Sequence, residues 1–198
     1  MFGIDVLAAA TLVGCWCTIA VVWLGGALYG TLRAPRDRIR GTSTPFALIA
    51  GSVVACSVVL VFARGLGEAI TTDSALVRVI GMVVLVVSTV FALWARRAIG
   101  LSWTVGPAVG GDRRLRTTGP YGVTRHPIYT GLVGMLLGTA LLGGLGQWIV
   151  LVVVGVIVAE VKIHIEEALL LSVFADEYRR YRERVPQLVP GVRLIRRV

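Results

Sequence analysis

Seven ionisable side chains lie at the edges of uncharged stretches in the C-terminal half of the chain. They are Arg125, His126, Glu160, Lys162, His164, Glu166 and Glu167. Ionisable residues at the edge of a hydrocarbon region are costly, so such a set predicts a functional site. A glutamate suits a cationic ligand and accepts hydrogen bonds from amino or hydroxyl groups, whereas a lysine can hold an anion. The set therefore predicts ligand binding at a membrane surface.

A structural role and a metal site are the alternatives for these residues. Lys162 and Glu166 are four residues apart on a predicted helix and could simply pair, with Arg125 as an anchor at the lipid headgroups. The two histidines and two glutamates lack the HExxH spacing of a zinc site, so no metal is expected. No GxGxxG sequence follows a predicted strand, which excludes a soluble dinucleotide-binding domain. A nucleotide-like cofactor would have to be held by loops and helix ends.

The stretch TTGPYGVTRHPIYTG, residues 117–131, contains two of these ionisable residues, Arg125 and His126. Glycines and a proline at residues 119, 120 and 122 break regular structure, so we expect Tyr121 to be presented on a turn. Pro127 suits the first turn of a helix, where its missing N–H costs nothing. The pattern predicts a helix N-terminus at the membrane surface that is suited to binding an anion.

The elements that position these groups are predicted to be transmembrane helices. Hydrophobic residues make up 56% of the chain and its mean hydropathy is +0.82, which indicates an all-α integral membrane protein. Uncharged runs predict three helices, within residues 6–32, 41–63 and 78–94. Residues 127–159 are also uncharged, but a single helix of that length would measure about 50 Å, too long for one ordinary span. The glycine-rich run at 143–146 predicts a hairpin of two short helices there, giving five spans in all.

The distribution of charge supports the hairpin and sets the orientation. The net charge is +9, but the arginines cluster between apolar runs, which favours membrane orientation and anionic lipids over nucleic acid as their explanation. A hairpin places every strongly basic segment on one face, as the positive-inside rule prefers. The N-terminus is then outside and the C-terminus cytoplasmic, and His126 and Glu166 share a face. Residues 166–185 are predicted to form an amphipathic cytoplasmic helix.

The chain is expected to form one membrane domain, 1–198. Residues 1–95 would supply three transmembrane helices, and residues 96–198 the cofactor-binding and catalytic half. The single lysine in the chain is typical of a GC-rich bacterial genome and favours a bacterial inner (plasma) membrane. Composition does not address the oligomeric state.

Two segments resemble a known enzyme family. GPYGVTRHPIYTG (residues 119–131) and KIHIEEALLLSVFADEYRRYRERVPQLVPGV (residues 162–192) are similar to the signature blocks of the isoprenylcysteine carboxyl methyltransferases and related membrane phospholipid methyltransferases. The resemblance covers roughly residues 95–192. It implies S-adenosylmethionine as the cofactor and a lipophilic acceptor that enters from the bilayer. That acceptor would be an isoprenylcysteine-like carboxylate or, second, a phospholipid.

The resemblance also implies roles for particular residues. It places cofactor contacts at Arg113, Arg114, Leu115, Arg116, Tyr121, His126, Pro127, Ile128, Tyr129 and Glu166. The catalytic residues would be Lys162, Glu166 and Glu167. The eukaryotic enzymes hold an arginine facing the substrate carboxylate where this chain has Lys162, which keeps the charge but loses the bidentate fork. Glycine is usual in the family where this chain has Ala175.

Two other functions remain open on sequence grounds. An NADPH-dependent membrane reductase of the sterol-reductase type uses a similar helical arrangement and a comparable Arg-His-Pro motif, but it would need further spans and a longer polar region. A non-catalytic membrane scaffold or small transporter is the alternative from another class.

Overall fold

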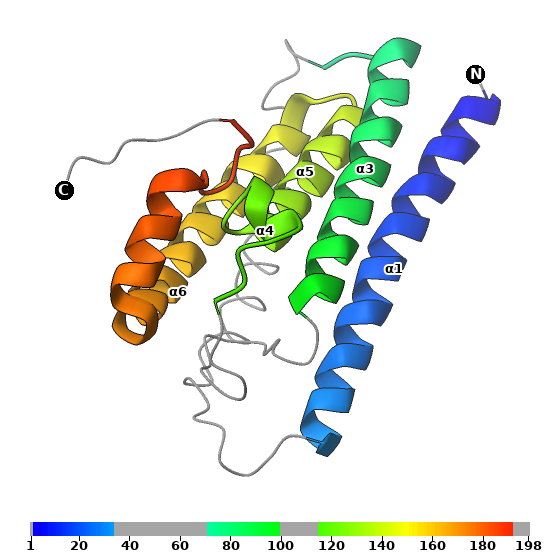
Figure 1. Cartoon of the computed structure of the whole chain (residues 1–198). Coiled ribbons are helices and arrows are strands. Elements are labelled where there is room, and N and C mark those ends of the chain that lie inside the picture. Colours follow the sequence, from blue (N-terminus) through cyan, green and yellow to red (C-terminus); the bar gives the residue numbers. More distant parts are fainter. Residues whose placement is uncertain (1, 34–70, 100–114, 192–198) are drawn as a thin grey trace.

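The computed structural model describes residues 2–33, 71–99 and 115–191. Regular structure in these three segments is helical, apart from an isolated bridge between Thr71 and Leu145. The elements are α1 (Phe2–Arg33), α3 (Ala75–Ile99), α4 (Pro120–Val123), α5 (Pro127–Leu142), the 3-10 turn η3 (Gly146–Trp148) and α6 (Ile149–Arg184). Figure 1 shows the long helices side by side. The predicted all-α class is confirmed, while the predicted helix within 41–63 lies outside the described residues.

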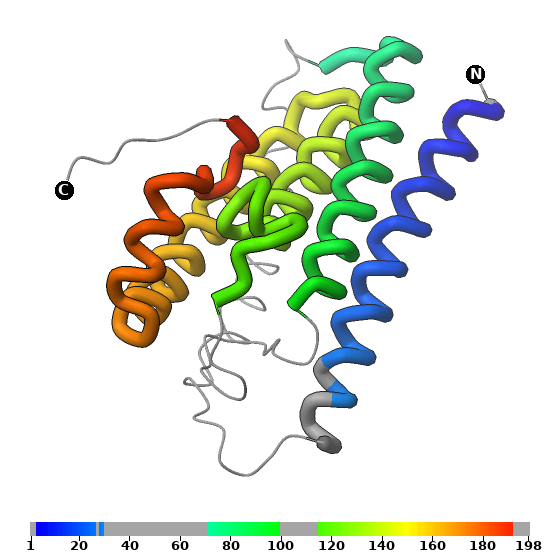
Figure 2. Tube along the Cα trace, viewed as in Figure 1, coloured from blue at the N-terminus to red at the C-terminus, as the bar shows by residue number. Residues whose placement is uncertain are grey.

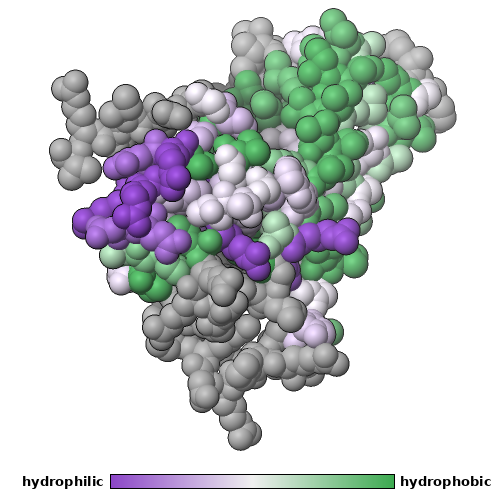
Figure 3. Space-filling model, in the orientation of Figure 1, coloured by the Kyte–Doolittle hydropathy of each residue, from purple (hydrophilic) through white to green (hydrophobic). Residues whose placement is uncertain are grey.

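Within the described residues, three helical segments are long and apolar enough to cross a membrane, namely Gly3–Gly26, Ala75–Ile99 and Gly146–Arg184. The α5 helix is apolar but shorter. Large hydrophobic side chains stay exposed along α1 and α3, including Val21, Leu24 and Val87. Figure 3 shows this apolar surface over the helices and the hydrophilic residues gathered over the C-terminal end of α6. Exposing such a surface to water costs free energy, whereas exposing it to lipid does not. The chain is therefore an integral membrane protein.

Glycines bring α3 and α5 into close antiparallel contact. A Cβ atom on Gly138 would lie 2.7 Å from the backbone nitrogen of Leu85, and one on Gly131 would lie 2.7 Å from the Cβ of Ala92. No real Cβ tolerates such distances, so only glycine permits this separation of the helices. In membranes, small residues of this kind allow backbones to approach and gain van der Waals contact. Gly134 and Gly138, four residues apart on α5, both face α3, at Ser88 and Leu85.

The α1 helix runs parallel to α3, as Figure 2 shows. Asp5, near the start of α1, forms an ion pair with Arg78, near the start of α3. Further along, Ile19 packs into a buried cluster with Leu85 and Met135. The chain therefore leaves α1 at the end of the molecule opposite to the one where α3 begins.

The hairpin predicted at the glycine-rich run is confirmed. Gly144, Leu145 and Gly146 have φ values of 81°, 65° and 45°, which end α5 and reverse the chain. The N–H of Thr72 donates to the carbonyl of Gly144 over 3.0 Å. This bond ties the hairpin turn to the chain just before α3, so both lie at the same end of the bundle.

The predicted amphipathic helix over 166–185 is wrong in one respect. Its residues belong to α6, which continues without interruption from the membrane segment as far as Ala175. There the backbone leaves the helical region, with φ 37° and ψ −110°, and the axis turns back so that 176–184 run towards α4 (Figure 1). Apolar periodicity does not reveal such a reversal, because both halves keep helical spacing. The returning segment buries Tyr178 and Tyr181 against the rest of the molecule.

Ala175→Gly should stabilise the protein. A left-handed backbone costs an alanine about 1–2 kcal/mol and a glycine almost nothing. We expect the free energy of unfolding in detergent to rise by about 1 kcal/mol. Ala168→Gly is the matched control, since Ala168 is exposed inside the regular part of α6. That change should lower the free energy of unfolding by about 1 kcal/mol. Equal destabilisation by both changes would show that Ala175 is not strained.

Candidate active site

The start of α5 is covered by the chain's own C-terminal segment. His126 caps the helix, with Pro127 at the first helical position as predicted. The backbone N–H groups of Arg125 and His126 donate to the carbonyls of Pro186 and Gln187, at 2.8 and 3.2 Å. Both donors lie just before the first helical residue, so the prediction that the N–H groups of the first turn of α5 bind an anion stays a prediction. The same two bonds hold the imidazole of His126 in the interior, with only 5% of the residue exposed.

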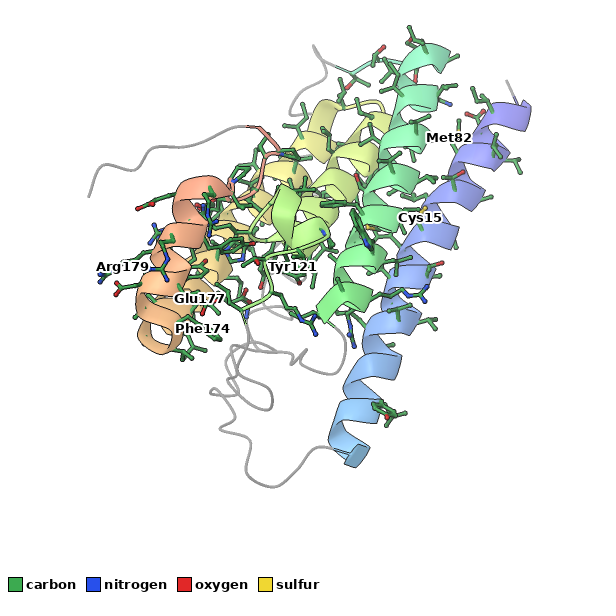
Figure 4. The ribbon with its side chains drawn as sticks, viewed as in Figure 1. Cys15, Met82, Tyr121, Phe174, Glu177 and Arg179 are labelled. Carbon is green, nitrogen blue, oxygen red and sulfur yellow. The ribbon has the colours of Figure 1, made fainter. Side chains whose placement is uncertain are left out.

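Tyr121 lies on α4, a single helical turn rather than an open turn, and its side chain is buried instead of presented to solvent. The hydroxyl of Tyr181 donates to the backbone carbonyl of Tyr121 over 2.5 Å, which fixes α4 against the returning part of α6. Burial, followed by the negative charge of Glu166, raises the pKa of the Tyr121 phenol well above its usual range. The phenol is therefore a neutral donor at physiological pH. Figure 4 shows Tyr121 directed to the inside of the molecule.

Glu166 joins the two sequence motifs. The hydroxyl of Tyr129 donates to its Oε1 over 2.5 Å, and Nδ1 of His126 lies 3.7 Å from its Oε2. The Glu166 side chain is 28% exposed, whereas His126 is buried. Residues from the start of α5 and the middle of α6 thus meet around one accessible carboxylate, which can accept hydrogen bonds from a ligand.

Glu167 is surrounded by donors from three segments. Its Oε1 accepts from Nε of Arg125 at 3.0 Å and from the hydroxyl of Tyr178 at 3.1 Å, and Nη2 of Arg125 lies 3.0 Å from the same oxygen in an ion pair. The Nε2 of His126 lies 3.3 Å from the same oxygen, and Nε of Arg182 lies 3.5 Å from Oε2. Arg125 also donates through Nη1 to the carbonyls of Arg182 and Val185. A carboxylate so supplied with donors is stable in its ionised form.

Sequence reasoning missed Tyr178 and Arg182. They follow Glu167 by 11 and 15 residues, which on a straight helix means about 16 and 22 Å along the axis. Only the reversal at Ala175 brings them back to the carboxylate. The one available signal was the usual glycine of the resembling family at this position, because glycine is the residue that tolerates such a backbone.

Lys162 is buried, with 8% of the residue exposed, and does not form the predicted alternative pair with Glu166. Among the residues that the structure describes, no hydrogen bond or ion pair of the Lys162 side chain is found. Glu166 instead takes the Tyr129 hydroxyl. A cationic side chain that is largely buried and has no partner among the described residues makes Lys162 a candidate for binding an anionic group.

The other predicted site residues take no part in the contacts of Glu166 and Glu167 described above. Glu160 accepts from the side-chain amide of Gln187 at 2.9 Å, and His164 is exposed on α6 with Nδ1 3.0 Å from the Glu160 carbonyl. Leu115 and Ile128 are half-buried, while Arg116 is exposed. Arg113 and Arg114 lie outside the described residues.

Comparison with known proteins assigns the chain to a class of membrane enzymes. A model of the phospholipid methyltransferase family matches residues 76–177, just over half of the chain. The chain therefore belongs to the phospholipid methyltransferase family. The matched region contains α3, α4 and α5 and most of α6, including Glu166 and its neighbours.

Two particular proteins are similar to it. Protein-S-isoprenylcysteine O-methyltransferase of Schizosaccharomyces pombe is 37% identical over 82 residues, which are 40% of this chain and 34% of that protein. The alignment thus spans about a third of the relative's length. The structure of the eukaryotic intramembrane Ras methyltransferase ICMT (isoprenylcysteine carboxyl methyltransferase) superposes with a TM-score of 0.62 at 21% identity. That match covers 94% of this chain and 68% of the other, and it shows a shared membrane fold.

Proposed function

We propose that this protein is an S-adenosylmethionine-dependent methyltransferase acting on a lipophilic acceptor that enters from the bilayer. The observation that carries the proposal is the accessible Glu166 carboxylate, held by Tyr129 beside His126, with Lys162 buried one helical turn earlier. Membership of the phospholipid methyltransferase family supports it. The same membership favours methyl transfer over an NADPH-dependent reductase, a scaffold or a small transporter.

The residues around Glu166 fit such a cofactor. A carboxylate in a poorly solvated place suits the cationic sulfonium and amino groups, and it accepts hydrogen bonds from amino or hydroxyl hydrogens. Tyr129 adds a phenol bonded to this carboxylate, and the Tyr121 phenol is a neutral group within its electrostatic influence. When bound, the cofactor would supply an activated methyl group whose transfer needs no metal. The protein's contribution is positioning, removal of water and placement of charge. We include Arg113, Arg114, Leu115, Arg116, Pro127 and Ile128 among the cofactor-binding residues by resemblance.

The acceptor is best matched by a carboxylate. Lys162 offers a positive charge on a largely buried side chain, with no partner among the described residues, and an acceptor carboxylate would neutralise it. A carboxylate oxygen already carries the electron pair that forms the new bond, so no base is required. A phospholipid amine would have to lose a proton and would gain nothing from Lys162. The names of the two similar proteins support an isoprenylcysteine-like carboxylate as the first choice.

We propose five spans, with the N-terminus outside and the C-terminus in the cytoplasm of a bacterial inner membrane. The parallel course of α1 and α3 supports a returning span within 41–63, outside the described residues. The hairpin between α5 and α6 supplies the last two spans. In this arrangement 1–95 is mainly scaffold, and 96–198 carries the site on the cytoplasmic face of one membrane domain.

A topology reporter tests this orientation. Because basic segments prefer the cytoplasm, a reporter fused after Val198 should give a cytoplasmic signal, and one inserted at Gly144 an external signal. The Gly144 insertion lies in the turn that ends α5, so antibody detection of the fusion should accompany the assay as a control for expression. Signals from the same side would exclude the hairpin as a pair of spans.

Glu166→Gln tests the cofactor assignment. The change keeps the shape but removes the charge, and loss of one charged hydrogen bond costs about 1.5–3 kcal/mol, or roughly ten- to a hundredfold in affinity. Isothermal calorimetry with S-adenosylmethionine should show that loss. Glu177→Gln is the matched control, because it makes the same change at an exposed glutamate on the returning part of α6. Equal cofactor affinity for Glu166→Gln and Glu177→Gln would remove Glu166 from the site.

Lys162→Met should separate donor from acceptor binding. We expect the KM for an anionic acceptor to rise about tenfold or more, since one charge-assisted contact is lost, while cofactor affinity stays within about twofold. Lys162→Arg should retain most activity towards a carboxylate. If Lys162→Met weakened cofactor binding as much as Glu166→Gln, the two residues would act as one unit and the division of roles would be wrong.

A further inference from the structure

We propose that Glu167 is a positioning residue that holds His126 with a proton on Nε2 and turns Nδ1 towards the accessible side of the site. The inference rests on the proposed function, and it assigns to Glu167 a role through His126 rather than direct contact with the reacting atoms. It also identifies which histidine nitrogen meets the ligand.

The contacts at Glu167 Oε1 determine the proton on the ring. Arg125 and Tyr178 already donate to this oxygen, at 3.0 and 3.1 Å. An ionised carboxylate is an acceptor only, so the imidazole nitrogen 3.3 Å from the same oxygen has to be the donor. That nitrogen is Nε2. Both side chains are buried, with 5% and 11% exposed, so water does not substitute for this bond.

The opposite nitrogen is thereby left for the ligand. Nδ1 of His126 faces Oε2 of Glu166 at 3.7 Å, beyond ordinary hydrogen-bond range. In the neutral ring with its proton on Nε2, Nδ1 is an acceptor, and the proposed tautomer therefore holds two acceptors, Nδ1 and the Glu166 carboxylate, close together at the accessible end of the cluster. A ligand group with hydrogens to offer, an amine or neighbouring hydroxyls, can satisfy both. Which nitrogen of a histidine carries the proton is commonly set by the partner of the other one, and here that partner is Glu167.

The reversal of the chain at Ala175 supplies further donors that hold the Glu167 carboxylate in place. It returns Tyr178 and Arg182 to Glu167, so the carboxylate is held on the side away from Glu166 by groups from its own helix. Arg125 holds it from the chain segment before α5. With its orientation fixed in this way, Glu167 can present a fixed acceptor to His126.

Nuclear magnetic resonance of histidine-labelled protein tests the protonation directly. The chain has two histidines, and His164→Gln leaves His126 as the one reporter. The ring ¹⁵N signals at neutral pH should show Nε2 protonated, and addition of S-adenosylmethionine should shift Nδ1 more than Nε2. A protonated Nδ1, whether or not Nε2 also carries a proton, would overturn the proposal. The tautomer is observed without cofactor, so a protein that fails to bind S-adenosylmethionine would refute the proposed function alone.

Glu167→Gln, made in the His164→Gln background, tests whether Glu167 determines which nitrogen of His126 carries the proton. An amide can either accept from or donate to the ring, so the Nε2 signal should move towards a mixture of tautomers, and cofactor affinity should fall about tenfold. Glu177→Gln in the same background is the matched control, because it makes the same change at an exposed carboxylate of α6 that does not contact His126. It should keep the Nε2 proton and leave cofactor affinity within about twofold. An unchanged tautomer in Glu167→Gln, or equal losses of affinity in both variants, would show a merely structural role.

Discussion

One buried carboxylate organises the functional half of the molecule. Glu167 takes donors from the segment before α5, from the cap of α5 and from the returning part of α6. In a poorly solvated interior such a charge is stable only when donors surround it, and removing one partner leaves the other buried and unpaired. The positions of Arg125 and His126 therefore depend on Glu167 as much as Glu167 depends on them. This mutual requirement places the neighbouring Glu166 at the accessible edge.

Two backbone features make the cluster geometrically feasible. The reversal at Ala175 brings Tyr178 and Arg182 back over a distance that a straight helix would not allow. The glycines of α5 let this helix lie against α3, which fixes the direction in which its N-terminus enters the site. Backbone bonds from Arg125 and His126 to Pro186 and Gln187 then tie the C-terminal segment over that N-terminus. The polar site is thus built on rigid packing between apolar helices, which suits a reaction that depends on positioning.

The sequence allowed the helical class, the hairpin at residues 143–146 and the proximity of His126 to Glu166 to be predicted, because these follow from hydropathy, glycine placement and charge. It did not allow the partner of Glu166 to be predicted. Helical spacing favours Lys162, but the Tyr129 hydroxyl from a facing helix forms the bond instead. Nor did it indicate that Pro186 and Gln187 occupy the start of α5, since those contacts are made by backbone atoms. The break at Ala175 was not predicted either, because an alanine carries no local signal for a left-handed backbone.

Binding of labelled S-adenosylmethionine to the purified protein in detergent, in parallel with NADPH, tests the central claim most directly. The account predicts saturable binding of S-adenosylmethionine that unlabelled cofactor displaces, and transfer of the labelled methyl group to a lipid-extractable acceptor. NADPH should neither bind nor compete. Saturable binding of NADPH, with no binding of S-adenosylmethionine, would contradict the account.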